Sequence, residues 1–127
     1  MTVLLALLAC TKAEDDTGGA GDAASVAESG ICANAPVETF ETFGSGFLLE
    51  NCQSCHASTS TNRNGAPGDV VFDDGDGVPS VGAAWTWAER ILARAATDTP
   101  TMPPMAGTTE DDRQRLTWWL TCAEPGT

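Results

Sequence analysis

Residues 52–56 of the chain read Cys-Gln-Ser-Cys-His, a C-x-x-C-H pentapeptide. His56 is the only histidine among 127 residues, so a metal site built on two or three imidazoles cannot form within the chain. The three other cysteines lie far away in the sequence, at Cys10, Cys32 and Cys122. The pentapeptide therefore brings together two of the five thiols and the only imidazole.

The C-x-x-C-H pattern is the attachment signature of c-type haem. Two thiols at this spacing reach the two vinyl groups of one haem and form thioethers, and the adjacent histidine supplies the proximal nitrogen to the iron. We therefore expect one covalent haem c on Cys52, Cys55 and His56. Two weaker interpretations remain. A thioredoxin-like redox pair would normally follow a strand in an α/β pattern. A half zinc site would need two more ligands, and only Cys32 and Cys122 remain.

The net charge limits the kinds of partner. The chain has 6 Lys and Arg against 18 Asp and Glu, which gives −12 at pH 7. Phosphate binding is driven by basic side chains, so we do not expect a nucleic-acid partner. An acidic surface favours a redox partner with a basic docking face. The alternative is that the charge only maintains solubility.

The first ten residues, MTVLLALLAC, contain an apolar run too short to span a bilayer. The run fits the core of a secretory signal, and its end resembles a bacterial lipobox. We expect residues 1–10 to be a lipoprotein signal and Cys10 to carry a lipid. The lipid would anchor the protein to a bacterial membrane, on the periplasmic side. No Lys or Arg precedes Cys10, unlike in most signals. The alternative is a buried N-terminal strand with an incidental cysteine.

Residues 12–30 are almost entirely small or polar, so they cannot bury enough apolar surface to offset the entropy of ordering. We read residues 11–30 as a flexible tether and residues 31–125 as one folded domain.

Helical periodicity in the domain predicts an all-α fold. One helix is expected over 37–51, a second over 81–97, and a third that Thr108 or Thr109 caps. The first places Phe40, Phe43, Phe47 and Leu48 on one face, and the last has an apolar face of Leu116, Trp119 and Leu120. Gly44 and Gly46 interrupt the first helix and suggest that another backbone approaches closely there. Residues 59–79 read as loop with a short extended piece at 70–72.

On these residues the chain resembles the class I cytochrome c family, from about Val37 to Cys122. Gly44 and Leu48 lie eight and four residues before the first cysteine of the motif, as is common in that family. The pattern Leu-x-x-aromatic-Leu at 116–120 matches the family's last helix. The resemblance implies three to four helices wrapped around one haem, with the first and last helices crossing tightly at Gly44. One departure is Ala57, where glycine is usual.

The resemblance also implies the ligands around the iron. Pro67 is expected to offer its carbonyl to the ring nitrogen of His56. The sixth ligand cannot be a second histidine, and the segment Thr-Met-Pro-Pro-Met at 101–105 resembles the family's distal loop. Met102, which directly precedes a proline, is favoured over Met105. The alternative is that both methionines only pack around the haem, which leaves the iron five-coordinate.

Other residues receive weaker roles. Arg90 and Arg94 could pair with the haem propionates, as could the indole nitrogens of Trp85 or Trp87. In the fold that the chain resembles, the helices beside Cys32 and Cys122 cross, so a disulfide is expected between these residues. The alternative is two free thiols.

Taken together, these features predict a membrane-tethered, extracytoplasmic electron carrier with one haem c and His/Met ligation, and no catalysis by the chain alone. The alternatives are a haem-based sensor with an open or displaceable sixth site, and an electron-feeding subunit of an oxidoreductase complex.

Overall fold

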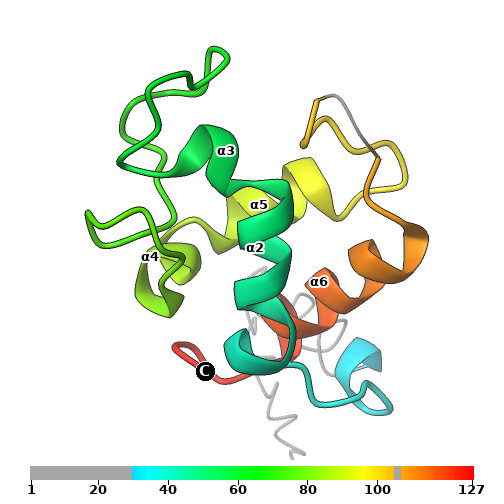
Figure 1. Cartoon of the computed structure of the whole chain (residues 1–127). Coiled ribbons are helices and arrows are strands. Elements are labelled where there is room, and N and C mark those ends of the chain that lie inside the picture. The colour runs from blue at the N-terminus through cyan, green and yellow to red at the C-terminus, as the bar shows by residue number, and fades with distance from the viewer. Residues whose placement is uncertain (1–29, 105–106) are drawn as a thin grey trace, which may run out of the picture.

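The computed structural model of the chain describes residues 30–104 and 107–127 (Figure 1). Within these ranges the fold is helical and has no strand, which agrees with the all-α expectation. The elements are η1 (Phe40–Gly44, a π-helical turn), α2 (Ser45–Asn51), α3 (Gln53–His56), α4 (Val81–Thr86), α5 (Ala88–Ala95) and α6 (Glu110–Cys122). The proposed signal with Cys10, most of the proposed tether and Met105 lie outside the described residues.

The helical region formed by η1 and α2 (the first region) begins at Phe40 because Thr39 caps it. The Thr39 side chain accepts a hydrogen bond from the Thr42 backbone, and the Thr42 side chain accepts one from the Thr39 backbone. The region continues through η1 and α2, so the expected helix over 37–51 starts three residues late. The backbone changes direction at Cys52 (φ −124°) and then makes the short turn α3, which the periodicity did not predict.

The first region crosses α6 (Figure 1), and the two are in close contact at Gly44. A Cβ atom placed on Gly44 would lie 2.5 Å from a ring carbon of Trp119, which is completely buried. The tight crossing that the family resemblance implied is therefore present. The neighbour is an aromatic ring, however, and not a backbone as the two glycines suggested. Nothing lies within 4 Å of a Cβ on Gly46, so the expectation was wrong for that residue.

The second predicted helix is divided into α4 and α5. Trp87 has φ −109° and ψ 10°, outside the helical region, so one helix ends there and the next begins. The loop after α5 returns to the end of that helix, because the backbone N–H groups of Thr101 and Met102 both donate to the Arg94 carbonyl, at 2.8 and 3.0 Å.

The last helix starts where the sequence predicts. Thr109 forms a capping box with Asp112, and Leu116, Trp119 and Leu120 of α6 are buried. One core joins the helices, and it consists of Phe43, Phe47, Leu48, Val70, Phe72, Ala84, Ile91, Ala95, Leu116, Trp119 and Leu120. Cys32 and Cys122 form a disulfide with 5.3 Å between their Cα atoms, as the resemblance implied. The same end of the molecule is also joined by an ion pair, in which Arg115 donates to Glu38 at 2.7 and 3.2 Å.

Candidate functional site

The C-x-x-C-H segment lies where α2 turns into α3. The backbone N–H groups of Cys55 and His56 both donate to the Cys52 carbonyl, at 3.1 and 2.9 Å, so the segment has the form of a helical turn. Residues at positions i, i+3 and i+4 of a helix share one side. The two thiols and the imidazole therefore face the same way, and both thiols are free.

The imidazole of His56 is held in one orientation. Its Nδ1 lies 2.9 Å from the Val70 carbonyl oxygen, and its ring stacks on Phe72 with 4.8 Å between the centroids. The Phe72 backbone N–H also donates to the His56 carbonyl, at 3.1 Å. A carbonyl oxygen can only accept, so Nδ1 carries the proton and the lone pair of the neutral ring is on Nε2. Among the described residues Nε2 has no hydrogen-bond partner, so this nitrogen is available to a metal.

The partner of His56 differs from the one expected, Pro67. The Pro67 carbonyl accepts from the Val70 backbone at 3.2 Å and from Arg63 Nη2 at 2.8 Å. The turn from Pro67 to Val70 uses the proline carbonyl to close itself, and this leaves the Val70 carbonyl to face the imidazole. The assignment of Pro67 was therefore wrong, although the loop that supplies the acceptor is the right one.

A second group of hydrogen bonds connects the motif to the loop beyond Phe72. The buried amide of Gln53 donates to the Gly77 carbonyl at 2.9 Å, and Asp73 accepts from the backbones of Ser58 and Gly75 at 2.7 and 2.8 Å. Burial by itself would raise the pKa of Asp73. The hydrogen bonds from Ser58, Gly75 and Gly77 outweigh it and lower the pKa to about 2. The ionised carboxylate thus fixes the segment that carries Val70 and Phe72.

The Cys52 thiol does not have the character of a thioredoxin-type nucleophile. Burial, followed by the proximity of Cys55, raises the pKa of Cys52 to about 12. A thioredoxin-type nucleophile needs a lowered pKa, because the thiolate is the reactive form. The described segments also contain no strand that could precede such a pair. Both observations argue against a thioredoxin-like redox pair.

A zinc site is disfavoured as well. Cys32 and Cys122, the other two cysteines among the described residues, are joined to each other. In the described part of the chain, no three His, Cys, Asp or Glu side chains are grouped so that they could hold a metal ion. Haem places no such demand on the chain, because the porphyrin supplies four of the six iron ligands.

The other expected ligands are placed as follows. Met102 is half-buried and packs against the hydrophobic core, and its backbone is fixed by the hydrogen bond to Arg94. The side chains of Arg90 and Arg94 are exposed, and the Arg90 guanidinium lies 5.6 Å from the centre of the Trp87 ring. The structure records no contact of either arginine with the motif.

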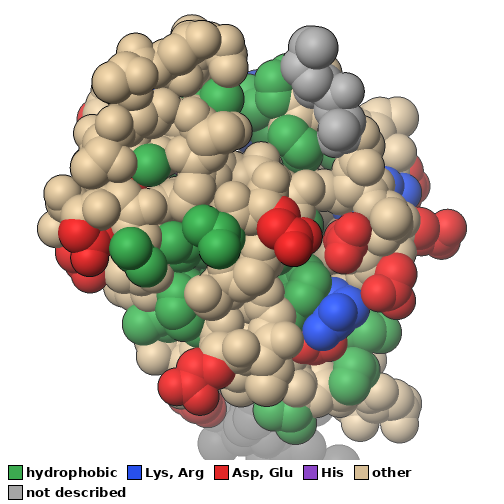
Figure 2. Space-filling model, viewed as in Figure 1, with side chains coloured by type: hydrophobic (Ala, Val, Ile, Leu, Met, Phe, Trp, Pro, Cys, Tyr) green, Lys and Arg blue, Asp and Glu red, His purple; other side chains and the backbone are tan. Residues whose placement is uncertain are grey.

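The chain offers features that suit a large group with carboxylate substituents. Arg63 Nε and Trp85 Nε1 are buried donors without a partner among the described residues. Buried N–H groups normally have an acceptor, which haem propionates could supply. Figure 2 shows several hydrophobic side chains at the upper edge, next to the lobe formed by α3 and the loop that follows it. The residues present therefore fit a haem.

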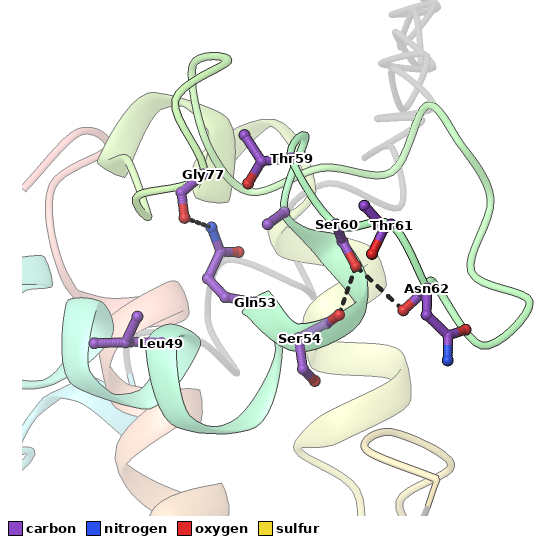
Figure 3. A pocket seen from close by; sticks show the side chains of 9 residues that line it. Leu49, Gln53, Ser54, Thr59, Ser60, Thr61, Asn62 and Gly77 are labelled. Atoms are coloured by element: carbon purple, nitrogen blue, oxygen red, sulfur yellow. Dashed lines mark hydrogen bonds between the residues drawn. The ribbon is translucent and has the colours of Figure 1, made fainter.

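A separate hollow lies beside the motif (Figure 3). It has a volume of about 590 Å³, is open to solvent, and is lined mostly by polar side chains, among them Gln53, Ser54 and Ser60. Gln53 and Ser54 are the two middle residues of the motif, so they project from a different side of the turn than the thiols. The hollow is therefore not the place where Cys52 and Cys55 would bind a group.

Several residues of the site could not be recognised from the sequence. Val70 and Phe72 contact His56, and Arg63 and Asp73 contact residues that flank it or hold it, all from seven or more residues beyond His56 along the chain. The only signal was the short apolar piece at 70–72, in a loop that is otherwise polar.

Comparison with known proteins gives no match: no protein-family model, curated protein or solved structure is found to be similar to this chain. The interpretation of the site therefore depends on its own residues. In the ranges that the structure describes, no helix has the length and apolar character needed to cross a bilayer.

Proposed function

We propose that this chain is a c-type cytochrome with one covalent haem, and that it carries single electrons outside the cytoplasm. One observation carries the proposal. Two free thiols and an imidazole lie on one side of a helical turn, and the imidazole is fixed through Nδ1 so that Nε2 is left for iron. A haem c would supply one-electron chemistry through the change between Fe(III) and Fe(II).

In this proposal each residue of the motif has one role. Cys52 and Cys55 attach the haem through thioethers, and His56 supplies the proximal nitrogen. Val70 and Phe72 hold the imidazole in its orientation, so that it does not rotate when the charge on the iron changes. Met102 is the proposed sixth ligand, because the chain has no second histidine.

The setting of the proposed cytochrome follows from charge and from the N-terminal sequence. Acidic side chains outnumber basic ones on the face drawn in Figure 2, and the whole chain has a net charge of −12. We propose a redox partner with a basic docking face, which would be attracted over a Debye length of about 8 Å at physiological salt. A lipid on Cys10 would hold the protein at the periplasmic side of a membrane.

The deciding experiment is expression in a bacterial host able to attach haem c. Wild-type protein should gain the mass of one haem, keep it through acid-acetone extraction, and give a c-type pyridine haemochrome spectrum. Cys52→Ala/Cys55→Ala should lose covalent haem. Cys32→Ser/Cys122→Ser is the matched control, because it also removes two cysteines, and it should retain the haem.

Two results would change the proposal. Covalent haem in the Cys52→Ala/Cys55→Ala variant, or none in wild type, would refute it. A shift of the Soret band when carbon monoxide is added to reduced wild-type protein would instead show an open or displaceable sixth site, as in a sensor.

A further inference from the structure

Arg63 is placed so that it can influence the proximal histidine without touching it. Its Nη2 donates to the carbonyls of Pro67 and Val70, at 2.8 and 2.9 Å, and its Nη1 donates to the carbonyl of Ala57, at 2.9 Å. The Val70 oxygen is also the acceptor for His56 Nδ1. The guanidinium and the imidazole are therefore two hydrogen bonds apart and share one carbonyl.

The three carbonyls that accept hydrogen bonds from Arg63 lie both before and after it along the chain. Ala57 directly follows the motif, whereas Pro67 and Val70 belong to the turn that reaches His56. The planar guanidinium holds several donors in a fixed arrangement, which an ammonium group cannot reproduce. Arg63 is half-buried, so water screens its charge less than at an exposed position.

The shared carbonyl has an electronic consequence. A carbonyl oxygen has two lone pairs, and here one receives a charged donor, which makes the stronger kind of hydrogen bond. The positive charge draws electron density from the Val70 oxygen and leaves it a weaker acceptor for Nδ1–H. An imidazole with a weaker hydrogen bond at Nδ1 gives less electron density to a metal on Nε2, so the oxidised metal is less stabilised.

We propose that Arg63 is a positioning residue that orients the Val70 carbonyl against His56 and raises the reduction potential of the iron. This inference rests on the proposed function, because it requires haem on His56. An arginine that only stabilised the loop would affect unfolding and leave the potential unchanged, and one that acted only by pairing its free Nε with a propionate would change the potential and leave the His56 Nδ1–H hydrogen bond unchanged. The proposal therefore concerns the electronic state of His56 as well as the fold.

The test compares three variants of the haem-loaded protein. Arg63→Gln removes the charge and most of the N–H donors. Arg63→Lys keeps the charge but loses the planar arrangement of donors. Arg113→Gln removes the same charge from α6, where the side chain donates to the Thr108 carbonyl. Potentials are measured by spectroelectrochemistry. In the reduced, diamagnetic protein, ¹H–¹⁵N NMR reports the strength of the His56 Nδ1–H hydrogen bond.

We expect Arg63→Gln to have a lower reduction potential than both wild type and Arg113→Gln. The His56 Nδ1–H resonance of Arg63→Gln should lie downfield of the resonance in those two proteins. Arg63→Lys should lie between wild type and Arg63→Gln in both measurements. An unmoved resonance across the variants, whether or not the potentials differ, would overturn the role of Arg63 while the cytochrome proposal stood. Absence of covalent haem from wild type would overturn both. If Arg63→Gln does not mature, Arg63→Lys alone decides, since the proposal requires its potential and its resonance to move.

Discussion

The crossing at Gly44 allows a test in which one substitution has opposite effects at two nearby positions. Gly44→Ala would place a Cβ 2.5 Å from the Trp119 ring, whereas carbon atoms in contact prefer about 3.5–4.0 Å. The ring would have to move by about 1 Å. It cannot do so freely, because it packs against Phe40, Phe43 and Trp85, and its Nε1 donates to the Thr127 carbonyl at 3.0 Å.

The expected change in the free energy of unfolding of Gly44→Ala follows from two opposing contributions. Overpacking of a buried site typically costs about 1–3 kcal/mol, and the clash with a fixed ring places Gly44→Ala in the upper half of that range. Replacing a helical glycine by alanine returns up to about 1 kcal/mol. We expect Gly44→Ala to lose about 1–2 kcal/mol of unfolding free energy. For a domain of this size that lowers the melting temperature by about 5–15 °C.

Gly46→Ala is the matched control. It is the same substitution two residues later, at an exposed position where nothing lies within 4 Å of the new Cβ. Only the gain in helix propensity applies, so the melting temperature should rise by a few degrees. Thermal unfolding followed by circular dichroism measures both variants. If Gly44→Ala is as stable as Gly46→Ala, the ring does not restrict this position and the reasoning on the helix crossing is wrong.

Three further predictions concern other parts of the fold. The lowered pKa of Asp73 contributes on the order of 2 kcal/mol of stability, present above about pH 4 and lost as the pH falls toward 2. Asp73→Asn should remove that dependence in acid unfolding curves, and exposed Asp74→Asn should keep it. Cys32→Ser should cost up to about 4–5 kcal/mol in urea unfolding, because the disulfide closes a loop with a sequence separation of 90; an unchanged midpoint would contradict this. Met102→Ala should remove the thioether–iron absorption band of oxidised haem-loaded protein, and a retained band would point to Met105.

The helical regions over 40–51 and 110–122 were predictable because the signals that form them are local. Thr109 and Asp112 lie within one turn, so the sequence shows the start of α6 directly. The division at Trp87 was not predictable in this way, because residues 81–97 have a helical pattern throughout. The backbone at Trp87 depends on how two short helices pack on the same core, which is a property of the tertiary structure.

The sequence by itself determined the chemistry of the candidate site: two thiols and one imidazole at a spacing that a helical turn brings to one side. It could not determine what holds the imidazole. Pro67 and Val70 are three residues apart. Which of their carbonyls reaches Nδ1 depends on the turn between them, which Arg63 stabilises through the Pro67 carbonyl and Asp73 through the Ser58 backbone. It likewise did not distinguish Gly44 from Gly46, because only the packing of α6 places Trp119 against one of them. Spacing along a helix is fixed by the geometry of the backbone, whereas contacts between distant segments are fixed only when the core forms.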